Sequence, residues 1–452
     1  MKLNFEKYIC LFQQKVTSLH AFSPQTDRLG GRRTKKQMKK TNITLLLLLV
    51  VALPLRAENG INSPYSQYGI GQLAGSASGF SRAMGGTGIA LRNENQINLL
   101  NPASYTSVDT LTFIMDLGLS LQNVNFAENG VRKNARNTTF DYIAMQYRLC
   151  KGLGMTLAFV PQSNAGYDYK TTETIRKDED GTITATNEYN GTGGLRDVMA
   201  GIGWNPFGGL SIGANARYTY GEISRYVENT YSDETIDART KTYYSLPRNL
   251  SADFGFQYQF KAGKEVVTLG ATYGMGWQLN DESYIIDYRS NSTALLSTDT
   301  VWCAGAFAPA PRWSAGISWK HDERLTLAAD FGMTQWSAVS FFNDHGCDSW
   351  HASVGAEYIP KLYSRHFFDR LKYRAGLFAS SPYYNINGAA GPMEYGATVG
   401  VGIPVVNSWN NRPNINVSGQ VVHVTGPIVE NCMRLCVSID FTESWFTKWR
   451  VN

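Results

Sequence analysis

The sequence predicts an all-β protein, a 14-stranded antiparallel transmembrane β-barrel with an N-terminal hatch segment in its lumen. Three observations predict this class: segments that alternate apolar and polar residues with period two, a secretory signal before them, and connections that alternate between short and long. Alternation alone also suits a half-buried sheet of a soluble protein. Its combination with an export signal and with alternating connections is typical of a barrel in the outer membrane of a Gram-negative bacterium.

The N-terminus has the parts of a secretory signal. Two lysines precede the apolar run 45–53, and the signal closes at Ala57. This run is shorter than the roughly 20 residues that a spanning helix needs. We therefore expect cleavage after Ala57 and a true start at Met38, so that residues 1–57 are an upstream extension plus a signal peptide.

The charge of the chain changes sign when residues 1–57 are set aside. These residues carry 11 of the 42 basic and 2 of the 37 acidic side chains, which leaves 31 basic and 35 acidic ones and a net charge of −4. A nucleic-acid partner is therefore not expected, because binding to phosphates needs a basic surface.

The remaining cysteines lack the paired spacing of a metal site. They are Cys150, Cys303, Cys347, Cys432 and Cys436. We expect inert thiols, and a Cys303–Cys347 disulfide is the alternative. Neither a metal nor a cofactor is expected.

Strands of the barrel can be assigned a lipid face and a lumen face from the alternation. Along 251–259 the apolar face holds Ala252, Phe254, Phe256 and Tyr258, and the other face holds Ser251, Asp253, Gly255, Gln257 and Gln259. The last strand repeats the pattern with Met433, Leu435, Val437, Ile439 and Phe441 against Arg434, Cys436, Ser438 and Asp440. Lipid should contact the first set of each strand.

We expect fourteen strands within residues 110–452, and twelve or sixteen are the alternatives. They are 111–122, 138–149, 152–160, 195–204, 209–220, 249–260, 266–278, 312–320, 324–333, 349–358, 370–379, 394–405, 413–421 and 432–441. An even number places both ends of the chain on the periplasmic side. The connections after strands two, four, six and eight are tight, whereas those after strands three, five and seven are long and polar loops, at 161–194, 221–248 and 279–311.

Aromatic residues lie near both ends of several strands, as in the girdles of membrane barrels. Trp204, Tyr258 and Trp319 lie near the expected periplasmic ends, and Tyr220, Trp277, Trp313 and Trp350 near the external ends. Core packing in an ordinary β protein is the alternative explanation for these rings.

Residues 58–109 lack alternation and are rich in Gly, Ser, Asn and Ala. Fourteen strands enclose a real bore, and this segment starts on the periplasmic side. Inward positions on two strands are small and make room for it: Gly270, Gly274, Gly276, Gly396, Gly400 and Gly402. We therefore expect residues 58–109 to form a hatch inside the barrel.

The hatch carries a family resemblance. Gly85-Gly86-Thr87-Gly88 followed by Asn101-Pro102-Ala103 is similar to the hatch of FadL-type long-chain fatty-acid transporters, where a Gly/Ala-rich stretch leads into an Asn-Pro-Ala motif before a fourteen-stranded barrel. The resemblance implies a hatch motif of Gly85, Gly86, Gly88, Asn101, Pro102 and Ala103, inward diffusion of hydrophobic compounds, and a kink in the third strand that opens the wall sideways. The corresponding strand here ends at Pro161. A departure is Ser104, where the family often has Gly.

Two functions follow from these observations. The first is passive transport of hydrophobic or amphipathic small molecules past the hatch. The candidate ligand contacts are Phe80, Met84, Ile89, Leu99, Leu100 and Phe378. Packing of the hatch against the wall would explain most of them equally well. The second function is that of the PorV-type relatives of this fold, which shuttle secreted proteins at the surface; here the long loops would bind a secreted-protein or surface partner.

Catalysis is not expected. The chain after residue 57 has five histidines, of which only His351 alternates inward on a strand, and it contains no Gly-x-Ser-x-Gly elbow, zinc motif or phosphate-binding loop. General acid–base chemistry and nucleophile activation need paired groups within hydrogen-bond reach, and the sequence offers no such pair.

Overall fold

The computed structural model describes most of the chain after residue 60. The described residues are 61–109, 112–128, 130–178, 181–233, 235–291, 294–303, 307–342, 344–361, 364–386, 388–405 and 413–444. The expected leader, residues 1–57, and the end of the chain after Ser444 lie outside them. Contacts divide the chain into 1–56 and 57–452, and only the second unit contains described residues.

Short elements precede the barrel: the 3-10 helices η3 (Pro64–Gln67) and η4 (Pro102–Ser107), the two-residue strand β1 (Gln72–Leu73) and the single helical turn α3 (Gly79–Arg82). The long strands follow. They are β2 (Thr112–Glu128), β3 (Val131–Cys150), β4 (Leu153–Pro161), β5 (Ser163–Asp178), β6 (Gly181–Phe207), β7 (Leu210–Tyr231), β8 (Ala238–Ser245), β9 (Pro247–Ala262), β10 (Glu265–Asp281), β11 (Tyr284–Ser290), β12 (Leu295–Trp302), β13 (Arg312–His321), β14 (Leu325–Thr334), β17 (Ser349–Tyr358), β18 (Lys372–Ser380), β21 (Glu394–Pro404), β22 (Asn414–Val424) and β23 (Val429–Ser444). Minor elements lie in the connections: η5 (Trp336–Ala338), β15 (Ser340–Phe341), β16 (Asp344–His345), η6 (Phe368–Arg370), β19 (Asn385–Ile386) and β20 (Ala389–Ala390).

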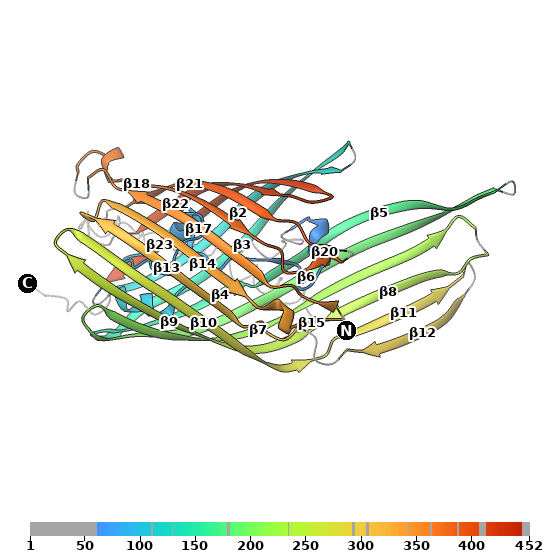
Figure 1. Ribbon diagram of the computed structural model, residues 1–452, viewed down its shortest axis with the longest axis horizontal. Helices are drawn as coiled ribbons and strands as arrows, with labels where there is room; N and C mark the ends of the chain where they lie inside the picture. Colours follow the sequence, from blue (N-terminus) through green and yellow to red (C-terminus); the bar gives the residue numbers. More distant parts are fainter. Residues whose placement is uncertain are drawn as a thin grey trace, which may run out of the picture. The chain divides into compact units, whose positions relative to one another are not determined.

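Fourteen antiparallel strands form a closed barrel, as the sequence predicts. Their order around the wall is β2-β3-β4-β6-β7-β9-β10-β13-β14-β17-β18-β21-β22-β23, and β23 pairs with β2 from Thr112↔Ser444 to Ala127↔Val429 to complete the circle. Figure 1 shows these strands side by side with a common tilt. Each of the fourteen expected strands corresponds to one strand of the wall, because the alternation that defines a strand is a local property of the sequence.

The two faces of the wall also agree with the prediction. On β9, Ser251, Asp253 and Gln257 are buried in the lumen, whereas Phe254 and Phe256 are exposed on the outside. Trp204 and Trp277 likewise point outward near opposite ends of their strands. The barrel therefore has an apolar outer surface and a polar inner one, as a protein surrounded by hydrocarbon requires.

The connections expected to be long loops are instead mostly strand, and this part of the prediction is wrong. β5 pairs with the first half of β6, the second half of β7 pairs with β8, and β11 pairs with β8 and β12. In Figure 1 these strands extend beyond the ends of their neighbours. The physical reason lies in their composition. Segments such as β5 contain Thr, Tyr and Ile, which have high β propensity, and strand pairing satisfies their backbone groups outside the membrane.

The five described cysteines are free thiols, so the alternative of a Cys303–Cys347 disulfide is not observed. Cys432 and Cys436 are both buried, and their spacing of four residues places them on the same inner face of β23. Among the described residues no helix is long and apolar enough to cross a membrane.

Candidate functional site: the lumen segment and its cavity

Residues 61–109, here called the lumen segment, contact the inner wall where glycines of adjacent strands stand in one row. Gly203, Gly213 and Gly255 are register partners across β6, β7 and β9. Pro102 lies against this row, and a Cβ added at Gly213 would lie 2.4 Å from the carbonyl carbon of Pro102. Because real Cβ contacts are never this short, the missing side chains create the space that η4 occupies.

A second row lies on the other side of the lumen. Gly355 and Gly376 are partners on β17 and β18, and a Cβ at Gly376 would lie 2.2 Å from the carbonyl carbon of Met84. On β10, a Cβ at Gly270 would lie 2.2 Å from the carbonyl oxygen of Ile89. The wall is therefore shaped to the backbone of the lumen segment at several separate places.

Asn101 links the lumen segment to itself and to the wall. Its side-chain oxygen accepts a hydrogen bond from the Ala103 N–H (3.0 Å), which caps η4, and Pro102 follows as the first residue of that helix. Its amide nitrogen donates to the carbonyl oxygens of Ile89 (2.8 Å) and Phe256 (3.1 Å). An Asn suits this position because it offers an acceptor and a donor together.

The glycine-rich turn is held by polar groups of the wall. Gly85 and Gly86 have φ of +72° and +85°, which favours glycine at both positions. The Gly85 N–H donates to the Thr398 hydroxyl (2.9 Å). Further along, Asp330 on β14 accepts hydrogen bonds from the backbone N–H groups of Gly88 (2.6 Å) and Ile89 (2.8 Å). The carboxylate thus replaces water for two backbone donors inside the barrel.

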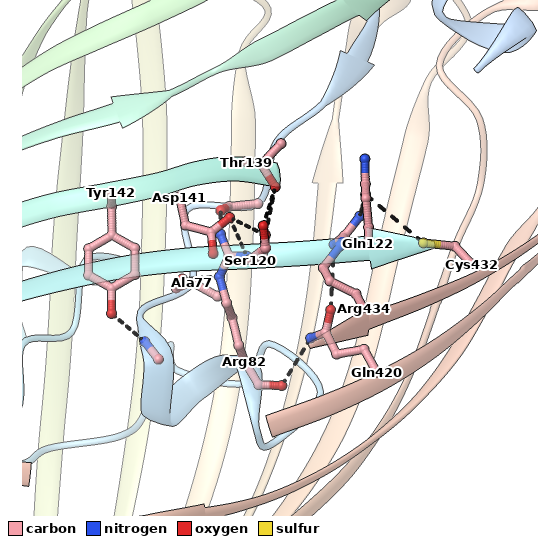
Figure 2. Close-up of polar contacts among 12 residues, drawn as sticks. Ala77, Arg82, Ser120, Gln122, Thr139, Asp141, Tyr142, Gln420, Cys432 and Arg434 are labelled. Atoms are coloured by element: carbon pink, nitrogen blue, oxygen red, sulfur yellow. Dashed lines mark hydrogen bonds and ion pairs between the residues drawn. The ribbon is translucent and has the colours of Figure 1, made fainter. Parts of the chain in front are cut away.

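A buried ion pair fixes the helical turn α3 to β3 (Figure 2). Arg82 Nη1 lies 3.0 Å from Asp141 Oδ1, and both side chains are about one-tenth exposed or less. Asp141 also accepts from the Ser120 hydroxyl (2.9 Å), and the backbone carbonyl of Arg82 accepts from Gln420 (3.2 Å). β2 pairs with β23 where the barrel closes. α3 is therefore joined to β3 on one side of this seam and to β22 on the other.

Arg92 is a second cation of the lumen segment, and its partners are all neutral. It donates to Ser211 (2.7 Å), Gln257 (3.1 Å) and Thr106 (2.7 Å). Burial lowers the pKa of its guanidinium to about 10. The side chain remains charged at neutral pH, and its hydrogen bonds join η4 to β7 and β9.

A cavity of about 450 Å³ lies between the lumen segment and the wall. Ile89 and Leu100 line it from the lumen segment, and Phe378 lines it from β18. His351 and Asp330 add polar groups, and the ring of His351 lies 6.1 Å from that of Phe378. The cavity is therefore amphipathic, and its volume is in the range that holds a small organic molecule.

The structure divides the six candidate ligand contacts into two groups. Ile89, Leu100 and Phe378 line the cavity. Phe80 and Met84 are fully buried in a cluster with Leu91 and Ala328, and Leu99 is fully buried in another cluster against the inner wall. The second group is accounted for by packing of the lumen segment.

The wall is incomplete beside the third strand. β3 pairs with β4 up to Ile143↔Phe159, and beyond this pair no described strand adjoins β3 on that side. β4 ends at Pro161, and β5 then pairs with β6 instead. Figure 1 shows the hairpin of β2 and β3 diverging from β5.

The lumen segment lies in this break. β1 pairs with the start of β5, with Gln72↔Asn164 and Leu73↔Ser163 as partners. The Ser63 N–H donates to the Gly166 carbonyl (2.9 Å), so the free edge of β5 is covered. Gln72 and Leu73 also line the cavity, so β1 borders the cavity and is paired with the strand that edges the break.

Sequence reasoning did not identify Asp330 or the glycine row of Gly203, Gly213 and Gly255. Each of these glycines is unremarkable within its own strand. Their common role depends on register between strands, for which a single sequence holds no signal. For Asp330 the sequence holds a weak signal, because this is an acidic residue at an inward position of a predicted strand.

Comparisons with known proteins agree with this geometry. The fold resembles three solved structures: a toluene transporter TodX of Pseudomonas putida (14% identity, 84% of this chain and 100% of that one, TM-score 0.55), the toluene transporter TbuX of Ralstonia pickettii (13%, 80% and 97%, 0.56) and a FadL homologue of Pseudomonas aeruginosa (11%, 82% and 98%, 0.52). At these identities the likeness is one of fold. No curated protein matches the chain.

The sequence itself matches a family model over nearly all of its length. The matching model is described as BamG and covers residues 38–452. This range includes the lumen segment, its hatch motif and every strand of the wall. The chain therefore belongs to the BamG family and has the fold of the FadL-type barrels.

Proposed function

We propose that this protein is an outer-membrane channel for passive transport of hydrophobic or amphipathic small molecules, with residues 58–109 acting as its hatch. The observation that carries the proposal is the position of the cavity, which is lined by Ile89, Leu100 and Phe378 and by β1, the strand paired with β5 at a break in the wall. A solute in this cavity needs only a displacement of β1 to reach the membrane.

The chemistry of the cavity supports an amphipathic solute. Phe378 and Leu100 provide apolar contact, and His351 and Asp330 provide hydrogen-bonding groups. Apolar solutes cross a hydrated pore poorly, and a lateral exit lets them pass directly into hydrocarbon. The similar barrels of Pseudomonas putida and Ralstonia pickettii are described as toluene transporters, which supports the same solute class here.

A reversible lock on β1 tests the route. Gln72 and Asn164 are antiparallel partners, so cysteines at both positions can form a disulfide across them. In a background with Cys150→Ser, we expect the oxidised pair to abolish uptake of labelled toluene and of a long-chain fatty acid by cells that lack their own transporters. Reductant should restore uptake.

The matched control places the same disulfide between Thr171 and Asn187, which are partners on β5 and β6 away from the break. It should leave uptake unchanged. Equal uptake by the oxidised and reduced forms of the Gln72–Asn164 pair would exclude a lateral route past β1.

Cavity-filling variants test the binding site. Ser380 lines the cavity from β18, and its neighbour Ala379 points to the other face. We expect Ser380→Phe to reduce uptake by displacing ligand volume, and Ala379→Phe to leave it unchanged. If the two variants transport equally well, the cavity is not on the route.

Deletion of residues 61–109 tests the hatch role. The wall keeps all its strand pairings, so we expect the variant to fold as a barrel that conducts ions in a planar bilayer. An unchanged, tight bilayer containing the folded variant would contradict a hatch role for the segment.

Binding of a protein partner is the second candidate function, and β12 favours it. This strand pairs with β11 on one side, and all eight of its residues are exposed, including Leu295 and Trp302. An exposed edge with large apolar side chains is a template for pairing with another chain. A stoichiometric protein that co-purifies with the barrel, and is lost when β11 and β12 are shortened, would favour this function over transport.

A further inference from the structure

The outer surface of the barrel has a groove that transport through the lumen does not use. It has a volume of about 690 Å³ and crosses β21, β22, β23, β2 and β3, which are consecutive in the wall. Its apolar lining includes Leu121, Val399, Val421, Met433 and Leu435. All five side chains are exposed on the lipid-facing side.

The groove exists because one lipid-facing position has no side chain. Gly419 on β22 has Val399 and Leu435 as its register partners on either side. A Cβ added at Gly419 would meet nothing within 4 Å. The larger residues around this glycine form the walls of a hollow whose floor is backbone, and such a hollow can accept an extended hydrocarbon chain.

A cation stands at the external end of the groove. Arg136 lines the groove from β3 and is exposed on the outer surface. Tyr147 follows eleven positions further along the same strand, near its periplasmic end. At about 3.3 Å per residue and a tilt of about 40°, this separation spans roughly 28 Å of membrane, close to the height of the apolar band of such barrels. Arg136 therefore lies at the level of the external headgroups.

Among the described residues that line the groove with Arg136, none carries a negative charge. Its register partner is Asn123, whose side-chain oxygen accepts from Asn134 (2.7 Å). Among the described residues, no hydrogen bond or ion pair engages the Arg136 guanidinium. A guanidinium at the level of lipid headgroups, above an apolar groove, matches a phosphate attached to acyl chains.

We propose that this groove binds a phosphorylated glycolipid of the outer leaflet, with one acyl chain over Gly419 and a headgroup phosphate on Arg136. The site differs from the lumen cavity in its location and in its ligand. It would seat a structural lipid against the seam where β23 closes the barrel on β2.

The experiment measures binding of phosphorylated and dephosphorylated lipid A to the purified full-length barrel in detergent by native mass spectrometry. We expect Arg136→Gln to weaken binding of the phosphorylated form by about tenfold and to leave the dephosphorylated form unchanged. Gly419→Leu should weaken binding of both forms, because its side chain fills the groove. Arg136→Lys should retain most of the binding, since it keeps the charge.

The matched control for the groove is Ala315→Leu, a similar enlargement on the outer face of β13. It should bind both lipids like the wild type. The proposal is overturned if Arg136→Gln and Gly419→Leu, each shown to be folded by heat-modifiable migration on gels, bind both lipids as the wild type does. It is also overturned if the two variants lose a stoichiometric protein partner while lipid binding is unchanged.

Discussion

Replacing Arg82 with Met should release α3 from the wall. The substitution removes the 3.0 Å contact with Asp141 and the hydrogen bonds that the guanidinium donates to the carbonyls of Ala77 (2.8 Å) and Gly75 (3.2 Å). Asp141 would then be a buried carboxylate whose remaining partner is the Ser120 hydroxyl. Removing one member of a buried ion pair typically costs about 3–5 kcal/mol, most of it from the charge left behind.

This cost should appear as faster local opening of the lumen segment. The N–H groups of Met84 and Gly86 both donate to the Ser81 carbonyl just after α3, and they report on its docking. A loss of about 3–5 kcal/mol corresponds to hydrogen exchange that is on the order of a hundred-fold to a few-thousand-fold faster. The wall strands should keep their slow exchange.

A double variant separates the unpaired charge from the loss of packing. Arg82→Met combined with Asp141→Leu buries no unpaired charge. The rate of hydrogen exchange in this double variant should therefore lie closer to the wild-type rate than the rate in Arg82→Met does. Lys170→Met is the control, because Lys170 pairs with Glu188 (2.6 Å) on the exposed strands β5 and β6. Unchanged exchange at Met84 in Arg82→Met, or faster exchange in the double variant than in the single one, would refute the reasoning.

Three further predictions concern packing and pH. Gly213→Val places a Cβ 2.4 Å from the backbone of the lumen segment. We expect this clash to displace η4 and to raise ion conductance in a planar bilayer. Unchanged conductance would contradict the tight contact. Phe80→Ala removes a fully buried ring and should weaken docking of the lumen segment by about 3–5 kcal/mol, measured by the same hydrogen exchange, and wild-type exchange would show that the ring contributes little. The hydrogen bond from Arg239 lowers the pKa of Asp287. The ion pair therefore stabilises the pairing of β8 with β11 fully at a pH above the ordinary aspartate pKa of about 4. This stabilisation is lost as the pH falls through the lowered pKa. Exchange of the β8 amides should therefore accelerate at low pH, and Arg239→Met should remove that dependence; an identical pH profile in the variant would contradict it.

The sequence predicted the wall in detail. The assignment of Phe254 and Phe256 to lipid, and of Asp253 and Gln257 to the lumen, agrees with their burial. Such assignments succeed because successive residues of a strand point to opposite faces, whatever the strand pairs with. The extended strands β5, β8, β11 and β12 were missed because polar residues outside a membrane give no contrast between two faces.

The lumen site could be predicted only in part. Asn101 and Pro102 were recognised from their motif, and Phe378 from its inward position on a strand. Phe80 and Leu99 could not be told apart from Ile89 and Leu100, because all four are apolar residues of one irregular segment and only packing decides which of them borders a cavity.

By itself, the sequence determined that this chain forms a β-barrel with an apolar outside, a polar inside and a glycine-rich segment before the first strand, and it favoured fourteen strands over twelve or sixteen. Only the tertiary structure decided that Gly203, Gly213 and Gly255 form one row under Pro102, that β1 fills the break beside β3, and that Gly419 leaves a groove below Arg136. The reason is physical: the face of a residue follows from its own strand, whereas a row, a break or a groove depends on the register of strands that are distant in the chain.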